Sequence, residues 1–213
     1  MMIDKKTSIL LVDDHVVVRN GIRLMLSTVP SLEVTAEASN AAEAIQLVRE
    51  RPFDVAILDL GLPDKTGLDL LKRILSERPQ IAILIYSMYG EEVYGIRAFK
   101  LGAAGFLSKN SDVATLIAAV TKVAAGGKFI STEISDKLVK IFRGEQTMHH
   151  DVLTNRELEV LRMLAAGEPL IKIAGILNLS ASTITTYRTR IMEKTGLKNN
   201  VQLARYAADF NLL

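Results

Sequence analysis

The chain has 213 residues, of which 49% are apolar and 23% charged, so its length suits one large or two small folded domains. No apolar run approaches the roughly 18 residues that a membrane-spanning helix needs, and the N-terminus lacks the pattern of a signal peptide. Cysteine is absent, which excludes disulfides and thiolate metal sites and agrees with a cytoplasmic location.

Charge differs modestly between the two parts of the chain. Residues 1–127 hold 14 Lys and Arg against 15 Asp and Glu, a net charge of −1, whereas residues 128–213 hold 12 against 9, a net charge of +3. Excess positive charge is the electrostatic footprint of nucleic-acid binding, so the C-terminal part is the better candidate for such contact.

Between residues 8 and 125, short apolar runs alternate with longer segments of helical periodicity. The apolar runs predict five strands, at residues 8–12, 33–37, 54–59, 81–86 and 106–107. The intervening segments predict five helices, at residues 16–28, 40–50, 67–78, 91–101 and 111–125, with Ser111 capping the last. This alternation predicts an α/β fold in which helices cover both faces of a five-stranded parallel sheet, doubly wound in the flavodoxin-like order.

Polar residues end the apolar runs of four of these strands. They are Asp13, Asp14, Asp59, Ser87 and Lys109. Because the carboxyl ends of parallel strands meet at one edge of a sheet, we expect these side chains to be neighbours. Three converging carboxylates repel one another, and hard oxygen ligands favour Mg²⁺. A carboxylate beside such a cation and a lysine can accept a phosphoryl group, whereas Asp59 taken alone is most simply a helix cap.

With these residues in place, residues 8–125 resemble the receiver domain of two-component response regulators. Besides the five polar residues, the resemblance rests on Pro63, Gly67 and the run Gly105-Phe106-Leu107-Ser108-Lys109. It implies that Asp59 is the phosphoacceptor and that Lys109 and Ser87 assist it. It also implies that Ser87 and Phe106 reorient on phosphorylation, although Phe106 is equally well explained as a core aromatic.

The same resemblance implies a set of metal ligands. Asp14, Asp59 and the backbone carbonyl of Gly61 would hold Mg²⁺, with Asp13 acting through water. One departure from the family pattern is Met88, which is larger than the residue common at that place. We expect Met88 to restrict the access of water and so to alter the lifetime of the phosphoryl group.

The chain after residue 127 has a different organisation. Residues 128–143 contain apolar residues at helical spacing, and residues 144–150 have no periodic pattern, so residues 128–150 are predicted to be a linker with an amphipathic helix. The pattern is then entirely helical, with helices predicted at residues 154–166, 170–177, 180–195 and 200–210. A short helix, a turn and a longer helix form the helix-turn-helix arrangement. The predicted domains are residues 6–127 and 151–213.

Residues 152–207 resemble the DNA-binding domain of the LuxR type, and the whole chain resembles the NarL/FixJ class of response regulators. The residues that carry this likeness include Leu153-Thr154-Asn155-Arg156-Glu157, Gly167, Ile173-Ala174, Leu179-Ser180 and Thr183-Ile184. Thr185 and Tyr187 depart from the residues common at their places. The resemblance implies a four-helix, all-α domain that binds double-stranded promoter DNA.

On a helix that begins after Ser180, one face is apolar and the other polar. Ile184 and Ile191 face the core, and Tyr187 either joins them or contacts phosphate. The outward residues predicted to reach base edges are Ser182, Thr185, Thr186 and Thr189. The cations predicted mainly to contact phosphate are Arg188, Arg190, Lys194 and, with less support, Lys198. The alternative is that these cations only solvate the helix.

The sequence therefore favours a phosphorylation-controlled transcription regulator, which is not an enzyme in the usual sense. It would receive the phosphoryl group from a histidine kinase and bind DNA as a homodimer, away from membranes. A phosphatase of the haloacid-dehalogenase sort is one alternative, but it needs an acid where Gly61 stands. A DNA-binding protein whose first domain only dimerises is the other, and the complete acidic site argues against it.

Overall fold

The computed structural model describes residues 6–132, 134–136, 139, 152–210 and 212. The chain forms two compact units, Met1–Ile134 and Ser135–Leu213. The boundary between these units lies seven residues beyond residue 127, where the sequence predicts the first domain to end. Among the residues that the structure describes, none of the helices has the length and hydropathy that a membrane crossing needs.

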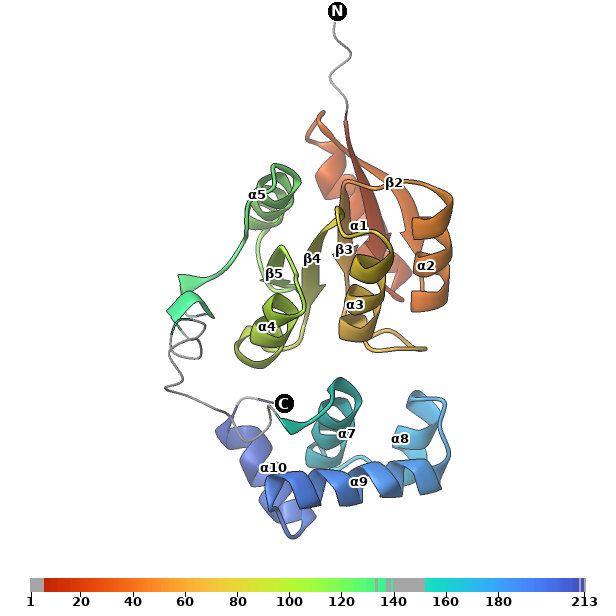
Figure 1. The fold of residues 1–213 in the computed structure, drawn as a ribbon, viewed down its shortest axis with the longest axis vertical. Coiled ribbons are helices and arrows are strands. Elements are labelled where there is room, and N and C mark those ends of the chain that lie inside the picture. The colour runs from red at the N-terminus through yellow and green to blue at the C-terminus, as the bar shows by residue number, and fades with distance from the viewer. Residues whose placement is uncertain (1–5, 133, 137–138, 140–151, 211, 213) are drawn as a thin grey trace, which may run out of the picture. The chain divides into compact units, whose positions relative to one another are not determined.

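The first unit alternates strands and helices, as the periodicity predicts (Figure 1). Its elements are β1 (Thr7–Val12), α1 (Val16–Ser27), β2 (Leu32–Ala38), α2 (Ala41–Glu50), β3 (Val55–Leu58), α3 (Gly67–Glu77), β4 (Ala82–Ser87), α4 (Glu91–Lys100), β5 (Gly105–Ser108) and α5 (Val113–Ala124). All strand pairs are parallel and the strand order is β2-β1-β3-β4-β5, so the predicted flavodoxin-like fold is confirmed.

The sheet is buried on both faces, which is why its strands read as continuous apolar runs rather than alternating ones. Side chains of α1 and α5 pack together on one face, where Leu26 and Val120 share an apolar cluster with Ile9, Ile57 and Leu84 of the strands. Right-handed crossovers place α2, α3 and α4 on the opposite face.

The register of the sheet decides which polar residues meet. Val12 of β1 pairs with Leu58 of β3, so Asp13 and Asp59 continue from paired positions. Ser87, at the end of β4, pairs with Ser108 of β5, and Lys109 follows. Residues far apart in the sequence are thereby gathered at the carboxyl edge of the sheet.

The second unit contains four described helices: α7 (Asn155–Ala165), α8 (Leu170–Ile176), α9 (Ala181–Thr195) and α10 (Asn200–Asp209). Thr154 and Glu157 form a capping box at the start of α7, and the side chain of Ser180 accepts a hydrogen bond from Thr183 N at the start of α9. Gly196 ends α9 with φ of 72°, a left-handed conformation that glycine adopts without a Cβ penalty. The core of the second unit includes Leu158, Leu161, Ile173, Ile184, Ile191 and Leu203.

Two details of the sequence prediction need comment. The prediction that Ser111 caps α5 was wrong. The capping residue is Asp112, and its carboxylate accepts a hydrogen bond from Thr115 N at 2.7 Å. Of residues 128–143, where an amphipathic helix is predicted, the structure describes 128–132, 134–136 and 139, and it gives residues 132, 134–136 and 139 a helical backbone. Phe129, within that range, instead forms a parallel β-bridge with Gly105 of β5.

Gly67, at the start of α3, provides the first testable prediction. A Cβ placed there would lie 2.2 Å from the carbonyl oxygen of Asp59 and 2.6 Å from Leu60 Cα, both backbone atoms that cannot move aside alone. We expect Gly67→Ala to destabilise the full chain by about 2–3 kcal/mol in urea unfolding followed by circular dichroism. Gly21→Ala is the matched control, because nothing lies within 4 Å of its Cβ and the site is inside α1. It should stabilise by about 0.5–1 kcal/mol. Equal effects at the two sites would contradict the steric argument.

Candidate functional site

Asp59 lies at the end of β3 and is 6% exposed. Its amide donates to the carbonyl of Val12 at 2.9 Å, which continues the pairing of β1 with β3. One carboxylate oxygen, Oδ1, accepts from Leu60 N at 2.7 Å, and the other, Oδ2, accepts from Lys109 Nζ at 2.7 Å. Both oxygens of this carboxylate are therefore oriented by donors at the carboxyl edge of the sheet.

Lys109 joins two of the aspartates. Its ammonium lies 2.6 Å from Asp13 Oδ2 as well as 2.7 Å from Asp59 Oδ2, and its own amide donates to the carbonyl of Ser87 at 3.0 Å. Burial by itself lowers the pKa of Lys109, but the hydrogen bonds and charges of Asp13 and Asp59 outweigh burial, so the pKa lies above its ordinary value of 10.5. Lys109 is consequently a fixed cation at neutral pH.

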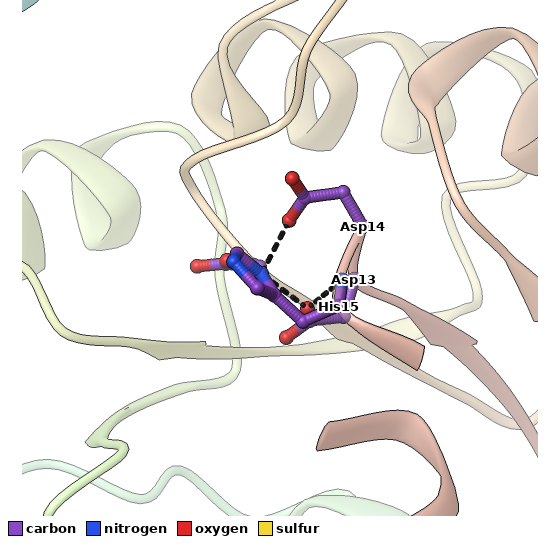
Figure 2. Close-up of side chains that lie close together, drawn as sticks. Asp13, Asp14 and His15 are labelled. Carbon is purple, nitrogen blue, oxygen red and sulfur yellow. Dashed lines mark hydrogen bonds and ion pairs between the residues drawn. The ribbon is translucent and has the colours of Figure 1, made fainter. Parts of the chain in front are cut away.

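The acidic pair after β1 is joined by a histidine that the sequence reasoning missed. His15 Nδ1 lies 2.7 Å from Asp14 Oδ1 and 3.3 Å from Asp13 Oδ1, as Figure 2 shows. Asp13 is buried, whereas Asp14 and His15 are exposed at the rim. The position of His15 directly after the acidic pair was the only signal that could have identified it.

The donor atoms fit a divalent cation. One ligand atom from each of Asp13, Asp14, His15 and Asp59 can be chosen so that all lie within 4.8 Å of one another. The cluster contains three carboxylates, and the Lys109 ammonium pairs with those of Asp13 and Asp59, so an excess of negative charge remains that a cation would offset. Carboxylate oxygens are the ligands that Mg²⁺ prefers, and the imidazole is compatible with other divalent metals.

Two further predicted residues lie in the core beneath this edge. Ser87 and Phe106 are each 1% exposed, and Ser87 Oγ accepts from Tyr89 N at 3.4 Å. The structure thus gives Phe106 the burial of a core aromatic, and a switch role for it stays a prediction.

The residue that borders Gly61 is Tyr89, which the sequence reasoning did not single out. A Cβ placed at Gly61 would lie 3.3 Å from the Tyr89 hydroxyl oxygen and 3.7 Å from Asp59 Oδ2. Met88, in contrast, is 61% exposed. The phenol of Tyr89, rather than the side chain of Met88, therefore borders the space next to the phosphoacceptor candidate.

In the second unit, α9 has the amphipathic form that its sequence predicts. Ile184 and Ile191 are buried and Tyr187 is half-buried. The outward residues Ser182, Thr185, Thr186, Thr189 and Arg190 are exposed. The threonine hydroxyls donate to backbone carbonyls one turn earlier, at 3.0 Å for Thr185 and Thr186 and 3.2 Å for Thr189. The remaining lone pairs of the hydroxyl oxygens and the methyl groups are available for contacts with a partner.

Two cations predicted to contact phosphate have partners within the second unit. Lys194 Nζ lies 2.7 and 2.9 Å from the carboxylate oxygens of Glu157, whose side chain is 3% exposed. Arg188 Nε donates to Asn200 Oδ1 of α10 at 3.0 Å. Lys194 thus has a structural contact between α9 and α7 that helical spacing alone could not reveal. Its phosphate contact stays a prediction.

Comparison with known proteins gives the family. Residues 9–121 match the response regulator receiver domain, and residues 151–207 match the bacterial regulatory proteins of the luxR family. The chain belongs to the NarL/FixJ class of response regulators. Both resemblances predicted from the sequence are therefore confirmed.

Full-length relatives share this organisation. Response regulator GacA of Pseudomonas aeruginosa is 33% identical, covering 93% of this chain and 94% of GacA. Transcriptional regulatory protein UhpA of Escherichia coli is 37% identical, covering 95% and 98%. The structure of the RcsB response regulator of Salmonella typhimurium matches with a TM-score of 0.72 and 26% identity, covering 97% of this chain and 98% of RcsB. This response regulator thus has the family's domain order over nearly its whole length.

The Lys194–Glu157 pair yields a stability prediction. Removing the ammonium strands a buried carboxylate, which in a fully buried pair costs about 3–5 kcal/mol. Because the side chain of Lys194 is 37% exposed, solvent reduces the cost, and we expect Lys194→Met to destabilise the helices of the second unit by about 1–2 kcal/mol. Native-state hydrogen exchange of α7 and α9 amides in the full chain measures this. Lys172→Met, which breaks an exposed pair with Glu168, should cost about 0.5 kcal/mol or less.

The same pair predicts a pH dependence. Burial raises the pKa of Glu157, but hydrogen bonds from Lys194 and Thr154 outweigh burial and hold the pKa below its ordinary value of 4.5. A carboxyl group whose pKa is lower in the folded than in the unfolded state stabilises the fold at pH values above its unfolded pKa. This stabilisation is lost as the pH falls through the folded pKa. Without Lys194 the effect of burial is less fully offset, so the pKa of Glu157 is higher in Lys194→Met than in wild type. The difference in unfolding free energy between the two proteins should therefore be constant at neutral pH and shrink as the pH falls through the pKa of Glu157 in the variant. A difference that grows on acidification would contradict this assignment.

Proposed function

We propose that this response regulator is a phosphorylation-controlled DNA-binding transcription regulator, with Asp59 as its phosphoacceptor. The observation that carries the proposal is the arrangement of Asp59, held between a fixed cation and two further carboxylates at the carboxyl edge of the sheet. Lys109 Nζ lies 2.7 Å from Asp59 Oδ2 and 2.6 Å from Asp13 Oδ2. The second unit supplies the output, a helix-turn-helix whose α9 presents threonines and cations outward.

The reaction is a transfer from a histidine kinase. A carboxylate oxygen of Asp59 attacks the phosphorus of a phosphohistidine, the P–N bond breaks, and the bonding electrons remain on the departing imidazole. The Leu60 amide, 2.7 Å from Oδ1, orients the nucleophile. The Lys109 ammonium and the Ser87 hydroxyl then stabilise the charge on the transferred oxygens.

Asp14, Asp59 and the carbonyl of Gly61, with Asp13 through water, would hold Mg²⁺. When bound, Mg²⁺ neutralises charge on the phosphoryl oxygens and on the crowded carboxylates. His15, whose Nδ1 lies close to both carboxylates, positions the exposed Asp14 next to the buried Asp13. The chain's own lysine completes the neutralisation from the buried side.

The DNA partner is double-stranded promoter DNA, bound by a homodimer. Support comes from the RcsB relatives, which are described bound to promoter rprA with the phosphomimetic BeF3⁻ and as two dimers on two parallel DNAs. In α9, Thr185, Thr186 and Thr189 use their hydroxyl hydrogens within the helix, so their oxygens are suited to accept from base amino groups. Ser182 is a further base-edge candidate, and Arg188, Arg190 and Lys194 supply phosphate contacts. The protein acts in the cytoplasm, where it has access to promoter DNA.

One prediction separates phosphorylation from DNA binding. The full chain is treated with Mg²⁺ and acetyl phosphate, and the DNA probe is a duplex selected from a random pool by the treated protein. Wild type should gain affinity about 5- to 150-fold, the range of a coupling of 1–3 kcal/mol, and dimerise in sedimentation. Asp59→Asn should do neither. A wild type that takes up phosphoryl on Asp59 yet gains no affinity would refute control by phosphorylation.

The lifetime of the phosphoryl group tests the role of Tyr89. We expect Tyr89→Ala to speed loss of the phosphoryl group roughly three- to tenfold, because removing the phenol opens the space beside Asp59 to water and lowers the barrier by about 1 kcal/mol. Met88→Ala is the control, since that side chain is largely exposed and should change the rate less than about twofold. A larger effect at Met88 than at Tyr89 would restore the expectation drawn from the sequence.

A further inference from the structure

The loop between β3 and α3 contains two of the proposed Mg²⁺ ligands. It begins with Asp59 and includes Gly61, whose backbone carbonyl is one of those ligands, and it ends where α3 begins at Gly67. A backbone carbonyl has no side-chain torsions with which to reach an ion. The shape of the loop therefore decides where the Gly61 carbonyl lies, and contacts that fix this shape matter for metal binding.

The first half of the loop is held by contacts within the loop and at the start of α3. Leu60 N donates to Asp59 Oδ1 at 2.7 Å, and the carbonyl of Leu60 accepts from Gly67 N at 3.0 Å. Leu60 is 3% exposed and Leu62 is 4% exposed, so both neighbours of Gly61 are buried. These contacts fix the backbone on either side of Gly61.

The second half of the loop is held by Asp64, which bonds to a distant helix. Its Oδ1 accepts from Ala41 N at 2.9 Å, and its Oδ2 accepts from Ala42 N at 3.0 Å. These are the first two residues of α2, and amides in that place have no acceptor within the helix. The N-cap of α2, Asn40, accepts from Glu43 N at 2.9 Å. Asp64 therefore completes the capping of α2 while it fixes the loop to that helix.

The start of α2 is a fixed point near the same edge of the sheet. The helix follows β2, whose last residue, Ala38, pairs with Val12 of β1. The carbonyl of Ala38 accepts from Asp13 N at 3.2 Å. A carboxylate suits the contact with α2, because both of its oxygens accept hydrogen bonds and the N-terminus of a helix favours negative charge. Asp64 thus ties the loop to the strand end beside Asp13.

We propose that Asp64 is a positioning residue of the metal site, and that its bonds to α2 hold the loop in the shape in which Asp59 and the Gly61 carbonyl bind Mg²⁺ together. This inference rests on the proposed function and adds to it a residue that the sequence reasoning did not single out. Asp64 acts through the loop, because α2 engages both of its carboxylate oxygens. Loss of a contact that orients metal ligands typically lowers metal affinity about 10- to 100-fold.

Mg²⁺ binding to the full chain, measured by isothermal titration calorimetry, tests the positioning role. Asp64→Ala should raise the dissociation constant for Mg²⁺ about tenfold. Asp64→Asn keeps an acceptor for one amide of α2 but not for the other, so it should raise the constant about threefold. The Mg²⁺ concentration that gives half-maximal phosphorylation by acetyl phosphate should rise by the same factors.

Asn40→Ala is the matched control, because it removes an acceptor from the same end of α2 and leaves the contact between α2 and the loop in place. It should lower the urea midpoint about as much as Asp64→Ala does, yet keep the dissociation constant for Mg²⁺ within about twofold of wild type. Circular dichroism verifies that each variant is folded, and Asp64→Asn decides the question if Asp64→Ala does not fold.

The outcomes separate this inference from the proposed function. If Asp64→Ala and Asn40→Ala weaken Mg²⁺ binding equally, Asp64 only caps α2 and the positioning role is wrong. If the folded Asp64 variants bind Mg²⁺ as tightly as wild type, the positioning role also fails, while the proposed function stands. If wild type itself binds no Mg²⁺, the positioning role and the proposed metal site fail together.

Discussion

The ammonium of Lys109, shared between Asp13 and Asp59, is the contact on which the first unit depends. It lies 2.6 Å from one carboxylate and 2.7 Å from the other, and it connects the end of β5 with the ends of β1 and β3. The sheet order separates β5 from β3 by β4 and from β1 by two strands, so this side chain spans the carboxyl edge. A phosphoryl group on Asp59 would change the charge at one of its two partners. Chemistry at Asp59 is therefore coupled to the position of β5.

The sequence predicted the fold and the convergence of the aspartates because both follow from patterns along the chain. Apolar runs that end in polar residues mark strands of a parallel sheet, and parallel strands bring those ends to one edge. The structure brings Asp13, Asp14, Asp59 and Lys109 together there. The capping box of α7 was similarly predictable, because its two residues are three positions apart and interact locally.

The contacts that escaped prediction are tertiary and have no periodic signal. Lys194 and Glu157 are separated by 37 residues, and nothing in the spacing of either helix indicates that they pair. Tyr89 was overlooked for its neighbour Met88, because sequence does not show which of two adjacent loop side chains turns inward. Phe129 lies in the range that the sequence predicts to be a linker with an amphipathic helix. Its bridge to Gly105 depends on an open strand edge that exists only once the sheet has formed.

The short length of β5 gives these contacts their functional meaning. Its four residues are paired with β4 on one side, and Gly105 forms a parallel bridge with Phe129 on the other. A long central strand would distribute a displacement over many hydrogen bonds, whereas a four-residue edge strand transmits it to a few. Lys109 directly follows this strand and Phe106 lies within it, so the cation beside Asp59 and the amide that donates to the carbonyl of Phe129 are three residues apart. A displacement of Lys109 would therefore reach Phe129 through a single short strand.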